Sequence, residues 1–405
     1  MRKLLGLAIV AALVLPGCTT VRDWFRSDDA KASAPTKLVD IEGAREVEKL
    51  WSESLGEGEG KLGFRQRPGF DGSTLFVVSD GGALRAIDVE TGDERWERDL
   101  EAVSNSRGWR IWQSGVREGG LQSSVGVGDG LVVVAGRSGA LFALSAESGE
   151  PRWEAQATAE VFAAPLIANG LVVVRSQDGR VVGLNAVDGK QRWAFDRAIP
   201  TLSSRGASTP TSAAGLVLIG HDDGTVVALR PDDGLPVWEA PVAEPEGRSE
   251  LDRLVDIDGD LALGADAVYA SSVRGMTAAI SITSGQIVWT RDNGGANSVE
   301  LTADGVLIAD KGGTLWSLDR AGGNALWRQE GLARRQPTGP ALAGNFAVVG
   351  DLEGYLHWFD PRTGSFVARE RVDNARILAT PIVTPTGTVV AVTDEGRLAA
   401  YRIIE

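Results

Sequence analysis

The stretch Gln177–Trp193 reads QDGRVVGLNAVDGKQRW and decides how the rest of the chain is interpreted. It begins with an Asp-Gly turn, continues as a short apolar strand, and passes through a second Asp-Gly turn into a strand that carries a tryptophan. Such turn pairs between β-branched runs are typical of antiparallel hairpins. The same pattern, with tryptophan fourteen residues after the first glycine, returns at Gly82/Trp96, Gly139/Trp153, Gly224/Trp238, Gly275/Trp289 and Gly313/Trp327. These internal repeats define the organisation of the whole chain.

Two further copies of the repeat are incomplete. The copy that opens at Gly354 has Ala368 where the tryptophan is expected, and the copy that opens at Gly396 reaches the chain end at Glu405 before its last strand. Near the other end, Trp51 stands alone in a strand-like segment, which is the simplest candidate for that missing strand. The sequence therefore predicts an all-β fold, an eight-bladed β-propeller of four-stranded antiparallel blades that both chain ends close in the last blade.

The repeated tryptophan has a structural interpretation. At one position per blade it can lie flat between neighbouring sheets, where it buries a large apolar area while its indole N–H finds an acceptor. Seven of the twelve tryptophans occupy this position, and we interpret them as docking residues rather than ligand contacts: Trp51, Trp96, Trp153, Trp193, Trp238, Trp289 and Trp327.

The N-terminus reads as a targeting segment. Residues 1–17 combine a basic start with an apolar run, as expected of a signal peptide. They end at Leu-Pro-Gly before Cys18, the only cysteine, and this ending resembles the lipobox of bacterial lipoproteins. The resemblance implies a lipidated Cys18, residues 18–45 as a lipidated flexible tether, and residues 46–405 as the propeller. It also implies an outer-membrane location, facing the periplasm of a Gram-negative bacterium.

Charge and repeat spacing indicate where to look for function. A formal net charge of −14 over 405 residues argues against nucleic acid or an anionic membrane surface as the main partner, so that contact with the membrane is expected through the lipid anchor only. The first glycines of successive repeats lie 38 to 57 residues apart, and the excess marks insertions at residues 101–120, 200–206 and 240–258. Loops on a rigid scaffold are the usual place for binding residues.

Two of these insertions flank the fourth blade and are expected to converge at one rim. They offer Leu202, Arg205, Asp256 and Asp258, which together suit a protein partner through charge-assisted hydrogen bonds and one apolar contact. The alternative, that Arg205 pairs with Asp256 or Asp258 inside the protein, remains open. The first insertion carries Trp109 and Trp112 beside arginines, which suits either a protein contact or burial over the end of the ring.

The docking element, as in Ala86–Trp96, resembles that of quinoprotein-type propellers. Within that fold the chain resembles the BamB family, lipoprotein subunits of the machine that inserts β-barrels into the outer membrane (the BAM complex). The lipobox, the docking repeats, Leu-Ser-x-Arg-Gly at 202–206 and the acidic segment 250–258 carry this resemblance. It implies that Leu202, Arg205, Asp256 and Asp258 bind periplasmic domains of a BamA-like barrel subunit. Ser204 departs from the hydrophobic residue of the family, although it remains a candidate contact. Unfolded outer-membrane proteins are further candidate partners.

An enzyme is the main alternative class. A quinoprotein dehydrogenase needs calcium ligands and a catalytic base, but the carboxylates form no recognisable calcium loop and the only cysteine is assigned to lipid. His221 and His357 are 136 residues apart in the sequence, and each is more typical of a satisfied sheet residue than of a metal pair. We therefore predict no catalytic residue, metal or cofactor. A periplasmic propeller that serves another envelope complex or peptidoglycan is the remaining alternative.

Overall fold

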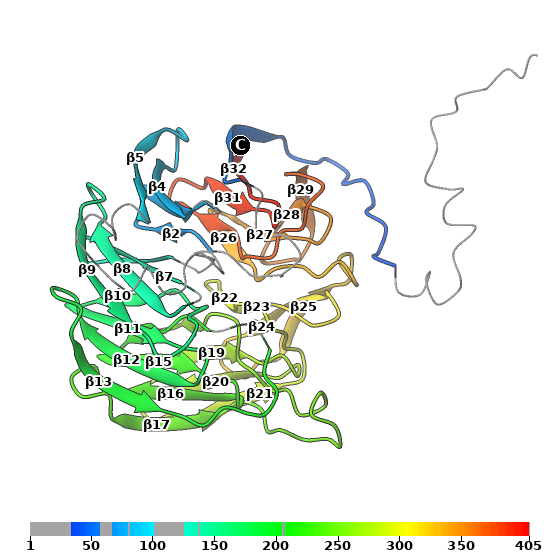
Figure 1. Ribbon diagram of the computed structural model, residues 1–405. Coiled ribbons are helices and arrows are strands. Elements are labelled where there is room, and N and C mark those ends of the chain that lie inside the picture. Colours follow the sequence, from blue (N-terminus) through cyan, green and yellow to red (C-terminus); the bar gives the residue numbers. More distant parts are fainter. Residues whose placement is uncertain are drawn as a thin grey trace, which may run out of the picture.

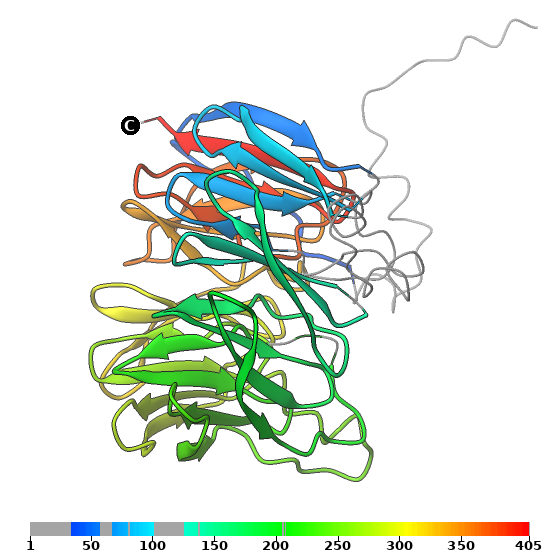
Figure 2. The same cartoon turned by 60° about the vertical axis from the view of Figure 1, so that its left-hand side comes forward.

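The computed structural model describes residues 34–56, 67–79, 82–100, 125–136, 138–204, 206 and 208–404. Within them, 32 strands form eight four-stranded antiparallel sheets, which follow one another as blades around a ring (Figure 1). Figure 2, turned by 60°, shows neighbouring blades stacked face to face. The predicted all-β, eight-bladed propeller is confirmed. No helix in the described part of the chain has the length and hydropathy needed to span a bilayer.

The strands of each blade are called a to d from the ring axis outward. Blades one to four are β2–β5 (Gly69–Phe70, Thr74–Val78, Ala83–Asp88, Glu94–Asp99), β6–β9 (Val125–Gly128, Leu131–Ala135, Ala140–Ser145, Pro151–Gln156), β10–β13 (Leu166–Ala168, Leu171–Arg175, Arg180–Asn185, Gln191–Asp196) and β14–β17 (Thr211–Ala213, Leu216–Gly220, Thr225–Leu229, Pro236–Pro241). Blades five to eight are β18–β21 (Ala262–Leu263, Ala267–Ser271, Thr277–Ser281, Ile287–Arg291), β22–β25 (Glu300–Leu301, Gly305–Ala309, Leu315–Asp319, Ala325–Gln329), β26–β29 (Ala341–Ala343, Phe346–Gly350, Tyr355–Phe359, Phe366–Arg371) and β30–β32 (Ile382–Val383, Val389–Val392, Arg397–Ile403) with β1 (Val47–Ser54).

Blade eight is assembled from both chain ends. Strand β1 pairs antiparallel with β32, and Trp51 lies opposite Ala400. Figure 1 shows the blue N-terminal part of the chain reaching the red β32. The first strands of the blades line a central cavity of about 650 Å³. Closure through β1 removes the exposed sheet edge that β32 would otherwise present.

The burial of the middle strands explains their composition. In β8 every residue is buried, and in β11 the same holds for all five residues. Each blade packs between two neighbours, so both faces of its middle strands meet apolar surface, and a continuous run of valine and leucine is favoured over alternation. The outer strand β13 instead has Trp193 as its one buried residue.

Each docking tryptophan joins its blade to the next one around the ring. All seven indole N–H groups donate to a carbonyl oxygen in the c–d turn of the following blade, at 2.7 to 3.1 Å. Trp153, for example, donates to the carbonyl of Ala186. The indole ring lies against the glycine of that turn, where an added Cβ would meet a ring atom at 2.4 to 2.7 Å. These glycines also have φ near +70°, so the turn needs glycine for two separate reasons.

The described part of the predicted tether is held against the propeller. Residues 1–33, which include the predicted signal peptide and Cys18, lie outside the described residues. From Ala34 onward the chain passes beside blades six and seven before it enters β1 (Figure 1). Thr36 N–H donates to the Ala333 carbonyl at 3.1 Å, and Arg45 N–H donates to the Val367 carbonyl at 2.8 Å. Residues 34–45 therefore make defined contacts with the propeller, in contrast to the flexible tether predicted for them.

Candidate partner-binding site beside blade four

The two linkers that enter and leave blade four meet on one face of the ring. The first follows β13 and the second follows β17. Because the strands of a blade alternate in direction, both linkers lie on the same face as the b–c turn. Ser204 N–H in the first linker donates to Asp256 Oδ1 in the second at 3.0 Å, and the Ser204 hydroxyl donates to Asp258 Oδ2. The predicted convergence of the two insertions is thus observed.

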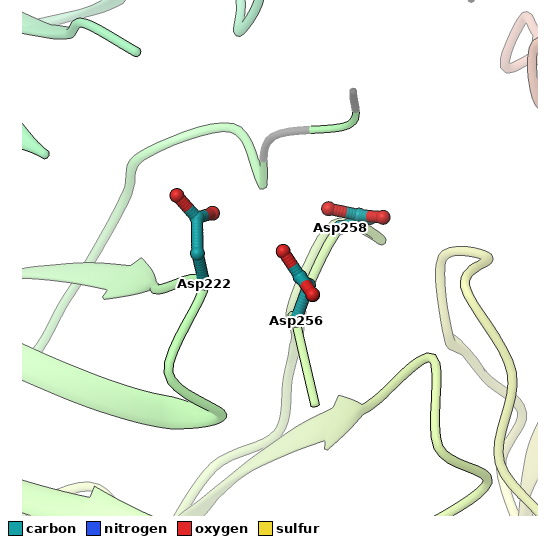
Figure 3. A group of neighbouring side chains, drawn as sticks. All are labelled: Asp222, Asp256 and Asp258. Atoms are coloured by element: carbon teal, nitrogen blue, oxygen red, sulfur yellow. The ribbon is translucent and has the colours of Figure 1, made fainter. Parts of the chain in front are cut away.

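Three carboxylates gather where the linkers meet. Asp256 and Asp258 come from the second linker, and Asp222 comes from the b–c turn of blade four, between β15 and β16 (Figure 3). One oxygen from each lies within 4.8 Å of the others. All three are buried, and Asp256 is fully shielded from solvent. We call Asp222, Asp256 and Asp258 the acidic cluster.

The described residues supply one ion pair and two hydrogen bonds to the acidic cluster. Arg175, at the end of β11 in blade three, forms an ion pair with Asp222, and both side chains are 3% exposed. Ser204 supplies two further hydrogen bonds, as described above. Among the described residues no donor reaches Asp256 Oδ2. Burying a carboxylate oxygen without a hydrogen-bond donor raises the free energy of the folded state, because the oxygen loses its hydration and gains no hydrogen bond in return.

The electrostatics of the cluster follow from this arrangement. Burial, together with the charges of Asp258 and Asp222, raises the pKa of Asp256 to about 7, although the hydrogen bond from Ser204 N–H opposes the shift. His221, in the turn directly after β15, is also buried. Its pKa lies well below the usual range because of burial and the nearby charges of Arg175 and Arg197. His221 is therefore neutral and does not compensate the acids.

Local packing holds the second linker in place. Ile257 is fully buried, and its side chain sits on Gly220 so closely that a Cβ there would lie 2.5 Å from it. Its N–H donates to the His221 carbonyl at 3.1 Å. Since neighbouring side chains of an extended segment point to opposite sides, an anchored Ile257 turns Asp256 and Asp258 together towards the cluster. Gly206 leaves room for Asp258, because a Cβ would lie 2.3 Å from its carboxyl carbon.

The structure brings most of the predicted residues of these two linkers together. Ser204, Asp256 and Asp258 are in direct contact, and Leu202, two residues before Ser204 in the same linker, has 42% of its surface exposed. Arg205 lies outside the described residues, as do Trp109 and Trp112 of the first insertion. The two acids are buried, so a partner would reach them through the linkers and not across an open surface.

Sequence reasoning missed Asp222 and Arg175. Asp222 belongs to a His-Asp-Asp-Gly turn, and since acids are ordinary turn residues, nothing in the sequence singles it out. Arg175 did carry a signal. It ends the apolar run Leu171–Arg175, and an arginine in a strand expected to be buried requires an acidic partner.

The fold and this site define a class of protein: a tryptophan-docked propeller whose candidate site is made by linkers between blades. A family model described as outer membrane protein assembly factor BamB matches residues 42–107, 99–329 and 311–404. Outer membrane protein assembly factor BamB of Xanthomonas campestris pv. campestris is 40% identical over 409 residues, covering 100% of this chain and 98% of its own. The Pseudomonas aeruginosa protein of the same name is 37% identical, covering 98% and 97%. The chain belongs to the BamB family.

Solved structures agree on the fold. The crystal structure of BamB from Moraxella catarrhalis superposes with a TM-score of 0.77 at 24% identity, covering 88% of this chain and 100% of that one. Quinohemoprotein alcohol dehydrogenase from Comamonas testosteroni superposes with a TM-score of 0.66 at 15% identity, covering 89% of this chain and 78% of that one. At these identities both comparisons bear on the fold alone. The named relatives are assembly factors, whereas the propeller itself is shared with dehydrogenases.

Proposed function

We propose that the chain is a non-enzymatic scaffold subunit in the assembly of outer-membrane proteins. In this proposal the linkers beside blade four bind the periplasmic domains of a BamA-like barrel subunit of the BAM complex. The observation that carries the proposal is the acidic cluster, three buried carboxylates held where the two linkers meet, in which no described donor reaches Asp256 Oδ2. Membership of a family named for outer membrane protein assembly supports it.

The chemistry of the site favours a partner that brings a cation and an apolar group. A guanidinium or ammonium directed at Asp256 and Asp258 supplies charge-assisted hydrogen bonds, which are stronger than neutral ones. The same two linkers expose apolar side chains: Leu202 in the first is 42% exposed, and Leu251 in the second is 70% exposed. An apolar contact next to a desolvated charge pair is the usual composition of an interaction hot spot.

The remaining parts of the proposal concern the anchor and the clients. A lipidated Cys18 would hold the propeller at the periplasmic face of the outer membrane of a Gram-negative bacterium, and the lipid would be its only attachment to the bilayer. Unfolded outer-membrane proteins are candidate clients. Radiolabelled palmitate incorporation that is lost in Cys18→Ala tests the anchor, and recovery of the wild-type protein without label would contradict it.

The experiment that tests the partner site is affinity isolation from detergent-solubilised envelopes. We expect Leu202→Ala combined with Asp256→Asn to reduce recovery of the barrel subunit by about tenfold or more, because hot-spot contacts dominate binding energy. The control is Asp232→Asn, an exposed acid in the c–d turn on the other face of blade four. Thermal unfolding checks that all variants are folded. Equal recovery by the combined variant and the control would contradict the assignment.

The enzyme alternative is tested separately, because the dehydrogenase shares the fold. Adding the quinone cofactor with Ca²⁺ is expected to leave the absorption spectrum of the protein and cofactor additive. A saturable spectral change with a defined stoichiometry would instead favour a quinoprotein enzyme.

A further inference from the structure

The junction between blades seven and eight departs from the docking rule. At the other seven junctions the indole of one blade donates to the c–d turn of the next blade. Blade seven has Ala368, fully buried, at the tryptophan position. Its expected acceptor is also missing, because strand c of blade eight, β32, ends at Ile403 and strand d is β1 from the other chain end. A c–d turn therefore does not exist in blade eight.

Two other aromatic side chains occupy the interior of this junction. Trp358 from β28 and Tyr401 from β32 are each 1% exposed and belong to the one apolar cluster that joins blades seven and eight. Trp358 lies opposite Ala368 in the pairing of β28 with β29. These rings restore the apolar volume, but neither provides the hydrogen bond between an outer strand and the following turn.

The two chain ends of blade eight continue as paired strands where the other blades turn. In the complete blades the c–d turn is closed by a backbone bond across five residues, as from Asp360 N–H to the Ser365 carbonyl at 2.9 Å. In blade eight the equivalent positions are Arg402 and Glu48, which lie opposite each other inside the β1–β32 ladder. The ladder continues to a bond from Ile404 N–H to the Glu46 carbonyl at 3.0 Å, so the residues before Glu46 extend the β1 end of the blade.

Arg45 supplies the contact that joins this extension of β1 to blade seven. Its N–H donates to the carbonyl of Val367, the residue before Ala368, at 2.8 Å. Its guanidinium lies over the ring of Phe346, 5.1 Å from the centroid. At the regular junctions the outer strand donates and the turn accepts. Here the direction is reversed, since Arg45 before β1 donates and the outer strand of blade seven accepts.

Residues 34–39 of the same segment accept further hydrogen bonds along blades six and seven. Arg334 Nε donates to the Ala34 carbonyl at 2.7 Å, and Arg335 Nη1 donates to the Thr36 carbonyl at 3.0 Å. Arg369 Nη1, on the outer strand of blade seven, donates to the carbonyl of Val39 at 2.9 Å. All three arginines donate to backbone carbonyls. These hydrogen bonds therefore depend on the backbone path of the segment more than on its side chains.

We propose that residues 34–46 form an N-terminal brace that replaces the eighth docking contact and locks blades seven and eight to blade six. Ring closure then depends on two elements, the β1–β32 pairing and the brace. The brace also fixes where the chain leaves the propeller towards Cys18, which is beside Arg334 and not at the start of β1.

Hydrogen exchange on two deletion variants of equal length tests the brace. Deleting residues 34–45 removes it and retains β1, whereas deleting residues 19–30 shortens the preceding segment by the same twelve residues. We expect the first deletion to speed amide exchange in β29 and β30–β32 by about tenfold or more, while blades two to four keep their protection. The second deletion is expected to exchange like the parent protein. Parent-like exchange after the first deletion, or an even loss of protection in all blades, would overturn the proposal.

If the first deletion variant does not fold, two point variants of Arg45 test the brace instead. Arg45→Pro removes the N–H that donates to Val367, whereas Arg45→Ala retains it and loses only the guanidinium. Faster exchange in β29 with proline than with alanine is expected. Equal exchange in both variants would show that the reversed hydrogen bond does not hold the junction.

Discussion

Blades four and seven carry polar centres at equivalent places, and the two centres differ in how their carboxylates are partnered. In each blade a glycine ends strand b, Gly220 or Gly350, and an isoleucine of the following linker packs onto it, Ile257 or Ile377. In blade seven the adjacent acid, Asp351, accepts from Arg335 Nε at 2.7 Å and bonds His357 Nε2 at 2.8 Å. In blade four Arg175 pairs with Asp222, while Ser204 donates to Asp256 and Asp258.

The pKa values reflect this difference. Burial opposes ionisation of Asp351, but its hydrogen bond with His357 and the charges of His357 and Arg335 outweigh burial and lower its pKa. Asp256 is equally buried, has no cation among the described residues as a direct partner, and has its pKa raised to about 7. A polar centre that satisfies itself is part of the fold, whereas one that keeps an excess of like charge is ready for a cation from outside. The difference separates a structural network from a candidate binding site.

The largest expected effect comes from breaking the blade-seven network. Arg335→Ala leaves Asp351 buried without its guanidinium, which should lower the free energy of unfolding by about 3–5 kcal/mol. Urea denaturation measures it. The double variant Arg335→Met with Asp351→Asn removes both charges and is expected to cost less than the single change. A single variant as stable as the parent would mean that the network is not structural.

Asp256→Asn should raise the free energy of unfolding, whereas Arg335→Ala should lower it. The folded-state pKa of about 7 lies above the reference value of 3.8, so the carboxyl lowers stability progressively as pH rises from about 4 through 7. Removing it should stabilise the protein by about 2–4 kcal/mol at pH 8, and by much less at pH 5. Thermal and urea unfolding at both pH values measure the difference. Equal effects at the two pH values would refute the shifted pKa.

Partner binding should release a proton if a cation enters at Asp256. Binding then lowers the pKa of this carboxyl, so affinity should fall by up to about tenfold per pH unit below pH 7 and level off above it. Titration calorimetry with the periplasmic domains, in two buffers of different ionisation enthalpy, counts the protons released. Asp256→Asn should bind without this proton release. Binding that is independent of pH in the parent would place the partner's cation elsewhere.

Ser204→Ala is expected to have the smallest effect. It removes the hydroxyl bond to Asp258 but retains the N–H bond to Asp256, and should cost about 1 kcal/mol of stability. Ser212→Ala, in the a strand of blade four, is a matched exposed control and should change little. A loss as large as that of Arg335→Ala would mean that Ser204 organises the whole linker.

Much of the fold could be predicted because its signals are local. Turn glycines, β-branched runs and the docking tryptophan all fall within one repeat, and the position of Trp51 was enough to predict closure by both chain ends. The site was only half predictable. Asp256 and Asp258 stood out through the insertion that contains them, while Asp222 resembles any turn acid. The contacts of residues 34–45 had no sequence signal, because arginines bind their backbone carbonyls.

By itself, the sequence determined the number of blades and the docking residues, and it singled out the linkers in which we propose a partner site. These depend on hydrogen bonding and packing within about forty residues, which periodicity records. The tertiary structure alone decided which charges meet. Arg175, Asp222 and Asp256 come from three separate segments, and their burial and mutual distances set whether an acid is satisfied or left with an excess of charge. The brace across blades seven and eight was decided in the same way, by the meeting of two chain ends.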